Sequence, residues 1–207
     1  TENHGYLSPT PGISKYEGVR RLGDINAQVY SVPNDDFDAA FRLPINAIND
    51  GQAVNFTTKA AELGGRAANF PARRVLYYLS QGASLKCFDG SNFFADSHNK
   101  GTGDNQITAT GSGAAGSYYI AALIVDTPLK PLFWQDREKF NLYNDEGDKG
   151  AEFRRYYRYW VHGRGAVGFG YWWDAIKVTV SGLPTAAEFF DNLNKIKYTF
   201  MGFKLPS

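Results

Sequence analysis

A glycine run is the first group of residues in this chain whose types and spacing could do chemistry. Gly111-Ser112-Gly113-Ala114-Ala115-Gly116 matches the Gly-x-Gly-x-x-Gly string of dinucleotide-binding loops. That chemistry needs a strand before the glycines and a helix after them, so that the helix N-terminus meets the pyrophosphate. The residues that follow, Ser117–Ile120, favour a strand because two of the four are tyrosines and one is isoleucine. We therefore do not expect a nucleotide site.

The other candidate ligands and nucleophiles are scattered. Asp96 and His98 could begin a metal site, but the sequence suggests no third ligand, and a surface turn is the favoured interpretation. Cys87 is the single cysteine, so it forms no intrachain disulfide and is expected to be a small buried apolar residue. The acidic segment Asp145–Gly150 lacks the spacing of a calcium loop and predicts a solvated loop. Together these residues predict no enzyme, no metal and no cofactor.

The most unusual segment is Phe153–Trp173, which is dense in aromatic residues and glycines. It predicts two antiparallel strands, Phe153–Val161 and Ala166–Trp173, joined by a turn at His162–Gly165. The arginines of this segment would form a solvated face, an interface or a DNA-facing surface. Exposed aromatic rings could also stack on sugars, which leaves a carbohydrate-binding module open as an alternative. These arginines are Arg154, Arg155, Arg158 and Arg164.

Composition narrows the class of protein. The chain has 207 residues, of which 43% are hydrophobic and 21% charged, and this is typical of a globular protein. Its formal net charge is +1, from 22 basic and 21 acidic residues, so strong non-specific binding to nucleic acid is not expected. No apolar run approaches the roughly 20 residues that span a bilayer, so no membrane is expected as a partner.

The elements that must position these residues follow from periodicity. Gln52–Gln81 predicts a helix with Val54, Ala61, Ala68, Ala72, Val75 and Leu79 on one face, and Pro71 predicts a kink or restart near Asn69-Phe70. Alternating residues before and after Pro33–Asp36 predict a hairpin, with arms of about ten residues that would project about 30 Å. Periodicity alone favours a projecting hairpin and an ordinary one equally.

The rest of the chain predicts fewer elements. Lys100–Ser117 is polar and rich in glycine, and it predicts a mobile loop. Thr185 and Glu188 have the spacing of a capping box, so a helix should begin there and a strand should follow near Tyr198–Leu205. The predicted inward-facing residues of that helix are Phe189, Phe190, Leu193 and Ile196.

Five sequence blocks resemble the Mu-like phage major head subunit family, often called the gpT family. They occur in the order of the family and span most of residues 5–175. The blocks are Gly5-Tyr6-Leu7 with Thr10-Pro11-Gly12; Gly64–Pro71; Cys87–Phe94 with His98 close behind; Lys130–Arg137; and Tyr159–Trp172.

The resemblance implies an α+β fold of the Hong Kong 97 type. Such a fold has an N-terminal arm, an extended β-hairpin loop, a peripheral domain with a long spine helix, and an axial domain. The axial domain should be reduced, because the segment between the third and fourth blocks is shorter than in typical members. The implied parts are an arm at 1–18, an extended loop at 19–50, a peripheral domain with the spine helix at 51–98, a loop and axial part at 99–152, peripheral strands at 153–182, and a C-terminal helix and strand at 183–207 that could belong to the axial domain.

The function implied by the resemblance is that of a major capsid protein. It would self-assemble as pentamers and hexamers into an icosahedral shell around double-stranded DNA, in the virion of a tailed phage or prophage assembled in the host bacterial cytoplasm. Possible partners are decoration, portal and scaffold proteins, with the DNA contacted weakly. Phe169, Trp172 and Trp173 would form an aromatic core. The expected subunit contacts on the extended loop are Arg20, Arg21, Asp24, Asp38, Phe41 and Arg42.

Overall fold

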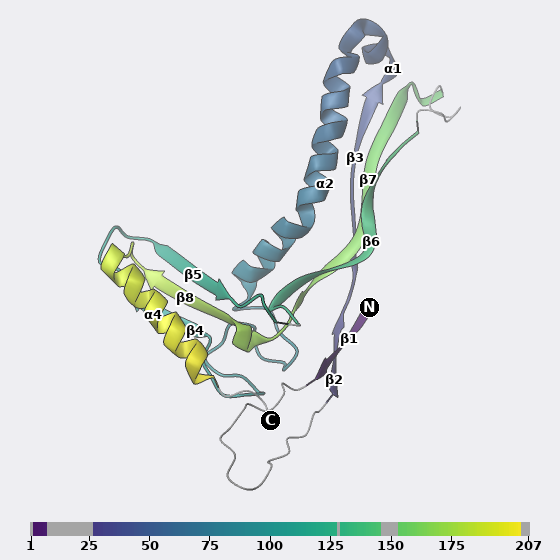
Figure 1. Cartoon of the computed structure of the whole chain (residues 1–207). Coiled ribbons are helices and arrows are strands. Elements are labelled where there is room, and N and C mark those ends of the chain that lie inside the picture. The colour runs from purple at the N-terminus through teal and green to yellow at the C-terminus, as the bar shows by residue number, and fades with distance from the viewer. Residues whose placement is uncertain (1, 8–26, 128, 146–152, 204–207) are drawn as a thin grey trace. The chain divides into compact units, whose positions relative to one another are not determined.

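The computed structural model describes residues 2–7, 27–127, 129–145 and 153–203 (Figure 1). The chain divides into two compact units. The first contains Pro33–Tyr77 and Trp134–Val167, and the second contains the described parts of Glu2–Val32, Tyr78–Phe133 and Gly168–Ser207. In chain order the elements are β1 (Glu2–Leu7), β2 (Ala27–Val32), β3 (Asp35–Pro44), α1 (Ile45–Ala47), the π-helical turn η1 (Ile48–Gln52), α2 (Ala53–Gln81), β4 (Gln106–Thr110), β5 (Ser117–Leu123), β6 (Leu132–Asn144), β7 (Tyr156–Phe169), the 3-10 turn η2 (Trp172–Asp174), β8 (Ala175–Ser181) and α4 (Ala186–Gly202).

The first unit is a narrow three-stranded sheet with one long helix beside it (Figure 1). The strand order is β3-β7-β6, and β3 pairs antiparallel with β7 from Asp35 opposite Gly165 to Pro44 opposite Tyr156. Helix α2 turns Leu63 and Phe70 toward this sheet, and the Phe70 ring lies 4.7 Å from that of Phe37 on β3. A helix and a sheet each bury one apolar face in this way.

Helix α2 confirms the predicted long helix but corrects two details. It stays helical through Pro71, so the predicted restart near Asn69-Phe70 is wrong. A proline inside a helix costs about 3 kcal/mol, which the packing of the neighbouring Phe70 helps to offset. The half-buried face contains Ala60, Leu63, Ala67 and Phe70 as well as the predicted Val75 and Leu79, whereas the predicted Ala61, Ala68 and Ala72 are exposed. The large side chains decide which face is inward, since alanines gain little from burial.

Strand β7 overturns the predicted hairpin of Phe153–Trp173. His162–Gly165, the predicted turn, lies in the middle of one continuous 14-residue strand. A Cβ on Gly163 would lie 2.6 Å from the ring of Phe140, and a Cβ on Gly165 would overlap the indole of Trp134. The glycines therefore make room for aromatic rings of β6 rather than for a turn.

The predicted hairpin around Pro33–Asp36 is also wrong, because its two arms do not pair with each other. Strand β2 pairs antiparallel with β1, from Glu2 opposite Val32 to Leu7 opposite Ala27. Strand β3 pairs with β7 instead. The hairpin in the structure is thus β1–β2, whose strands are connected by residues 8–26, outside the described residues.

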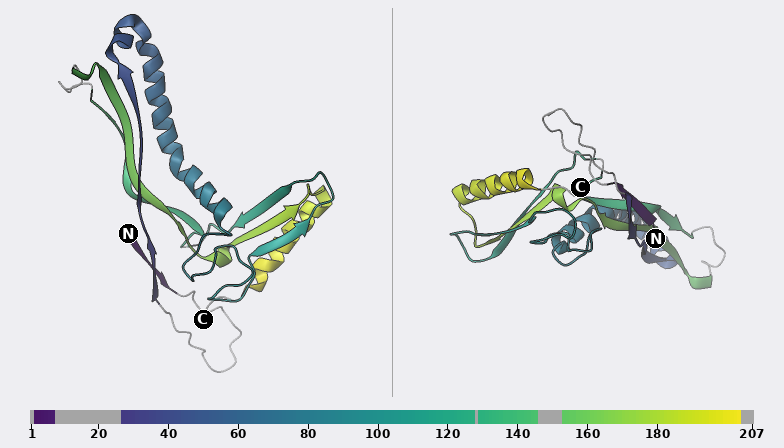
Figure 2. Two further views of the ribbon diagram at one scale, coloured as in Figure 1. Left: turned by 180° about the vertical axis from the view of Figure 1, so that it is seen from behind. Right: turned by 90° about the horizontal axis from the view of Figure 1, so that it is seen from below.

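The second unit contains a three-stranded sheet of order β4-β8-β5, covered on one face by α4 (Figure 2). The central strand β8 pairs in parallel with β4 and antiparallel with β5. Ile176, Val178 and Val180 alternate along β8 and are fully buried in a core that also includes Ile196 of α4. Strand β4 lies inside the predicted loop Lys100–Ser117, so that prediction was wrong for these five residues.

Helix α4 confirms the capping box. Glu188 N donates to Thr185 Oγ1, and Thr185 N donates to Glu188 Oε2. The helix continues to Gly202, so the strand predicted near Tyr198 is wrong over the described residues. Of the predicted inward-facing residues only Ile196 is buried, and Phe189, Phe190 and Leu193 are exposed. The buried face also includes Asn192, with Phe200 and Phe203 packed against the core.

Candidate functional site

The β3–β7 pair of the first unit brings most of the described predicted site residues together. Directly paired residues on antiparallel strands have their side chains on the same face of the sheet. One face carries Phe37, Ala39 and Phe41 on β3, and Phe37 contacts α2. The opposite face, here called the polar face, carries Asp36, Asp38 and Arg42 on β3 and Arg158, His162 and Arg164 on β7.

Several charged side chains of the polar face have partners within the chain. Arg164 Nε donates to Asp36 Oδ1. His162 Nδ1 lies 3.8 Å from Glu138 Oε1 on the neighbouring strand β6. Arg42 lies over the ring of Tyr156, 5.9 Å from its centroid. This surface is therefore mixed in sign rather than basic.

The carboxylate of Asp145 anchors two of the remaining arginines. Arg158 Nε and Arg154 Nη2 donate to Asp145 Oδ2 at 2.8 and 2.7 Å, and Arg158 N donates to Asp145 Oδ1. The hydrogen bond from the Arg158 backbone is the main reason that the pKa of Asp145 is lowered. Asp145 is buried, so the prediction of a solvated loop was wrong for this residue, and Glu146 and Asp148 lie outside the described residues.

Arg155 is the fourth predicted arginine and has a different environment. Its φ is 57°, in the left-handed region that non-glycine residues rarely adopt. Its carbonyl accepts from Ile45 N at 3.1 Å, and its guanidinium donates to Asn46 Oδ1 at 3.3 Å. The residue thus ties β7 to the start of α1.

The face toward α2 leaves open grooves between helix and sheet. One groove has a volume of about 330 Å³ and is lined by apolar side chains, including Phe37, Leu63 and Phe70. A second, of about 370 Å³, is lined by Phe41, Leu63 and charged residues of α2. Phe41 stacks on Tyr159 with ring centroids 5.0 Å apart. Its half-buried ring thus already has a partner within the subunit.

The second unit contains a polar cluster that the sequence did not predict. Cys87 is buried, as expected, but its Sγ donates to Asp89 Oδ1 at 2.9 Å. His98 Nδ1 lies 3.1 Å from Asp89 Oδ2, and both side chains are fully buried, so the surface turn predicted at His98 is wrong. One ligand atom from each of these three residues lies within 4.8 Å of the others. The Cys87-x-Asp89 spacing upstream of His98 was the signal that could have indicated this cluster.

The aromatic residues that were expected in the core are buried in the second unit. Trp172 and Phe169 are 0% and 2% exposed, and Trp173 is 7% exposed, which confirms that prediction. Phe169 stacks on Phe93 with centroids 4.4 Å apart. These rings are therefore not available to stack on a sugar, so a carbohydrate-binding module gains no support.

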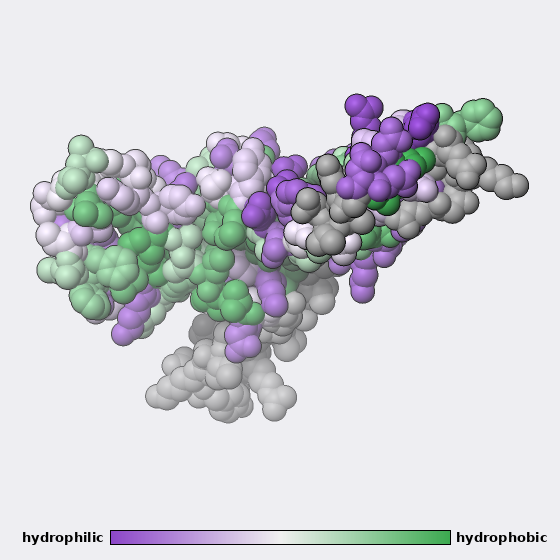
Figure 3. Space-filling view, turned by 90° about the horizontal axis from the view of Figure 1, so that it is seen from above, coloured by the Kyte–Doolittle hydropathy of each residue, from purple (hydrophilic) through white to green (hydrophobic). Residues whose placement is uncertain are grey.

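The outer surface of the second unit is apolar in places. In Figure 3 green groups reach the surface over β5 and α4. On α4 the outward side chains include Phe190, Tyr198 and Met201, which are 64%, 68% and 74% exposed. Exposed apolar patches on a folded protein are typical of contact surfaces.

Three of the predicted contact residues, Arg20, Arg21 and Asp24, lie outside the described residues, in the connection between β1 and β2. Across the parts of the chain that the structure describes, every helix is too short or too polar to cross a bilayer.

Comparison with known proteins identifies relatives over most of the chain. A family model described as "Mu-like prophage major head subunit gpT" matches residues 1–197. The Mu-like prophage FluMu major head subunit of Haemophilus influenzae is 28% identical over 204 residues, covering 91% of this chain and 66% of that protein. The major capsid protein of Escherichia phage Mu is 25% identical over 189 residues, covering 86% of this chain and 61% of that protein. The chain therefore spans slightly less than two thirds of the length of these relatives.

Solved structures give the same fold. The capsid of bacteriophage JBD30 matches 96% of this chain and 67% of its own chain, with a TM-score of 0.78 at 16% identity. The JBD30 capsid decorated with minor capsid protein trimers matches with a TM-score of 0.71 at 18% identity, over 96% of this chain and 65% of that chain. The expected Hong Kong 97-type capsid fold is thus confirmed.

Proposed function

This chain belongs to the Mu-like prophage major head subunit gpT family, and we propose that it is the major capsid protein of a tailed phage or prophage. In this role it self-assembles as pentamers and hexamers into an icosahedral shell around double-stranded DNA. The observation that carries the proposal is the likeness to a phage capsid fold over 96% of the chain. We infer a structural protein without catalytic activity, located in the virion and assembled in the bacterial cytoplasm.

The β1–β2 hairpin is the best candidate for the extended loop. Its strands pair over six residues each, and Arg20, Arg21 and Asp24 belong to the connection between them. A two-stranded ribbon is marginal in water, so it is expected to lie on another surface. We assign that surface to a neighbouring subunit. This replaces the loop boundaries of 19–50 by the hairpin Glu2–Val32.

The polar face of the first unit is the second proposed subunit contact. Asp38 and Arg42 are exposed on β3, beside the ion pair of Asp36 with Arg164. Surfaces of mixed sign can fix the orientation of a neighbour, because a misplaced neighbour meets like charges. Phe41 borders the groove on the other face and would contact a neighbour only through that groove.

The proposed contact with DNA is weak. The net charge is +1, and Arg154, Arg158 and Arg164 already pair with carboxylates of the chain. Neutralised arginines release few counterions on binding phosphate, so they contribute little affinity. Decoration, portal and scaffold proteins are the other partners we propose. Decoration is supported by the capsid relative whose structure includes minor capsid protein trimers.

The hairpin assignment can be tested by a change that keeps every described helix and strand. Leu7 and Ala27 are directly paired, so an Asn-Gly turn can replace residues 8–26 and close the hairpin. We expect a folded chain, by circular dichroism, that no longer forms shells or capsomers in electron micrographs. A variant in which Arg20, Arg21 and Asp24 are all replaced by alanine keeps the length of the connection. It therefore tests the contribution of the three side chains separately from that of the loop.

Two results would contradict the proposal at different levels. Normal shells from the shortened chain would remove the hairpin from the assembly contacts but leave the head-protein assignment intact. A permanently monomeric unaltered chain, across assembly conditions, would count against the head-protein assignment itself.

A further inference from the structure

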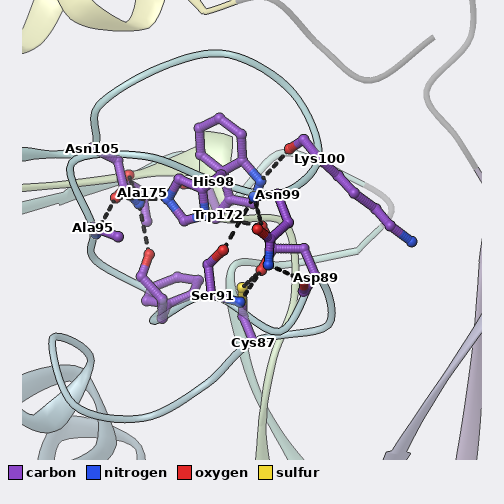
Figure 4. Close-up of polar contacts among 11 residues, drawn as sticks. Cys87, Asp89, Ser91, Ala95, His98, Asn99, Lys100, Asn105, Trp172 and Ala175 are labelled. Carbon is purple, nitrogen blue, oxygen red and sulfur yellow. Dashed lines mark hydrogen bonds and ion pairs between the residues drawn. The ribbon is translucent and has the colours of Figure 1, made fainter.

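The segment 82–105 of the second unit is held by a buried polar network rather than by regular secondary structure. Between α2 and β4 the described backbone forms turns, bends and isolated bridges, one of which pairs Lys86 with Asn92. Figure 4 shows the side chains of His98, Asp89 and Asn105 at the centre of this network, beside Trp172. Long irregular segments inside compact units need such anchors.

The orientation of the Asn105 amide is fixed by its neighbours. Its Nδ2 donates to the carbonyls of Phe93, Trp172 and Ala175 at 2.8, 3.1 and 3.2 Å. Its Oδ1 accepts from Ala95 N at 2.9 Å. Rotating the amide would turn its oxygen toward three carbonyls and its NH2 group toward an N–H. Asn105 Oδ1 is therefore the atom that faces His98 Nε2, at 3.1 Å.

The carboxylate of Asp89 is ionised. Burial raises its pKa, but the hydrogen bonds with His98, Cys87 and Ser91 together lower the pKa by more, so the net pKa is well below the ordinary value. Asp89 Oδ1 accepts from Cys87 Sγ and Ser91 N, and Oδ2 accepts from Asn99 N at 3.2 Å and faces His98 Nδ1. When the contact with His98 is included, each carboxylate oxygen has two hydrogen-bond partners, so Asp89 needs no proton of its own to satisfy them.

Both ring nitrogens of His98 thus face acceptors. A neutral imidazole has one N–H and one lone pair, so either neutral tautomer would set a lone pair against an oxygen. We propose that His98 is a doubly protonated imidazolium that donates to Asp89 and Asn105 at once and clasps segment 82–105 onto η2 and β8. The ring stacks on Trp172 with centroids 3.9 Å apart and an interplanar angle of 1°, an arrangement that favours a cation.

A proton fits this site better than a metal ion. Each oxygen of Asp89 already has two partners, and a metal would have to displace the Cys87 thiol proton. Burial is the main reason that the pKa of this thiol is raised. The hydrogen bond to Asp89 raises the pKa further, so the thiol keeps its proton.

The test counts the ring protons of His98. In 15N-histidine-labelled protein near pH 7, the resonances of His98 are assigned by their absence in His98→Gln. We expect an N–H at both ring nitrogens, and loss of the Nδ1–H alone in Asp89→Asn, where an amide N–H can donate to Nδ1. A single ring N–H in the unaltered protein overturns the proposal, and so does one zinc ion per chain by elemental analysis. If His98→Gln does not fold, His4→Gln and His162→Gln assign the other two of the three histidines, so that His98 is identified by elimination.

Discussion

The ring of Phe140 on β6 lies directly over Gly163 on β7, so that a Cβ at position 163 would be 2.6 Å from Phe140 Cδ1. The ring cannot easily move away, because Phe70 of α2 packs against it with centroids 5.4 Å apart. Gly163 thus links strand β7, strand β6 and helix α2 in the first unit. A methyl group there would have to displace an aromatic ring that is held on its other side.

Gly163→Ala should therefore destabilise the first unit. Forcing extra carbon atoms into a packed site typically costs about 1–3 kcal/mol. Urea unfolding followed by tryptophan fluorescence measures the change, since Trp134 lies in the same cluster. Gly64→Ala is the matched control, because a Cβ there meets nothing within 4 Å and the residue lies within α2. The control should gain up to about 1 kcal/mol. A Gly163→Ala variant as stable as Gly64→Ala would contradict the packing role.

The polar face can be tested by exchanging its ion pair. In Asp36→Arg combined with Arg164→Asp, the internal pair is kept but its two charges exchange places. Because exposed pairs contribute only about 0–1 kcal/mol, the double variant should be as stable as the unaltered chain. If a neighbour docks on this face, shell formation should fall sharply in electron micrographs. Normal shells would show that the pair has only an internal role.

The capping box of α4 predicts a stability change in acid. The hydrogen bonds from the backbone N–H groups of Thr185 and Ser112 lower the pKa of Glu188 to about 2. A carboxylate whose pKa is lower in the folded state stabilises the protein above its unfolded pKa, about 4.3 for Glu. That contribution should disappear as the pH falls from about 5 toward 2. Thermal unfolding at several pH values measures it, and Glu188→Gln should lack this component. An unchanged acid profile in the variant would exclude the role.

The sequence predicted the features that depend on local spacing. The Thr185 capping box and the helix over Gln52–Gln81 are set by residues within a few turns of one another. Strand pairing could not be read in this way. Nothing near Gly163 or Gly165 in the sequence says that rings of β6 will cover them, so glycine looked like a turn residue. Likewise, Asn105 donates to the carbonyl of Trp172, and His98 stacks on the ring of Trp172, only after segments 67 or more residues apart have come together.

At position 155 we expect a glycine variant to be more stable than an alanine variant, which is the reverse of the usual order. Its φ of 57° costs a residue with a Cβ about 1–2 kcal/mol, whereas glycine adopts this region freely. Arg155→Ala keeps the strain and loses the hydrogen bond to Asn46, so it should be less stable than the unaltered chain. Arg155→Gly loses the same bond but relieves the strain, so it should exceed Arg155→Ala by about 1 kcal/mol in urea unfolding. Both variants remove the guanidinium, so if Arg155 contacts a neighbour they should impair shell assembly alike despite their different stabilities. If the more stable variant, Arg155→Gly, assembles better than Arg155→Ala, the role of Arg155 is limited to the folding of β7 and α1.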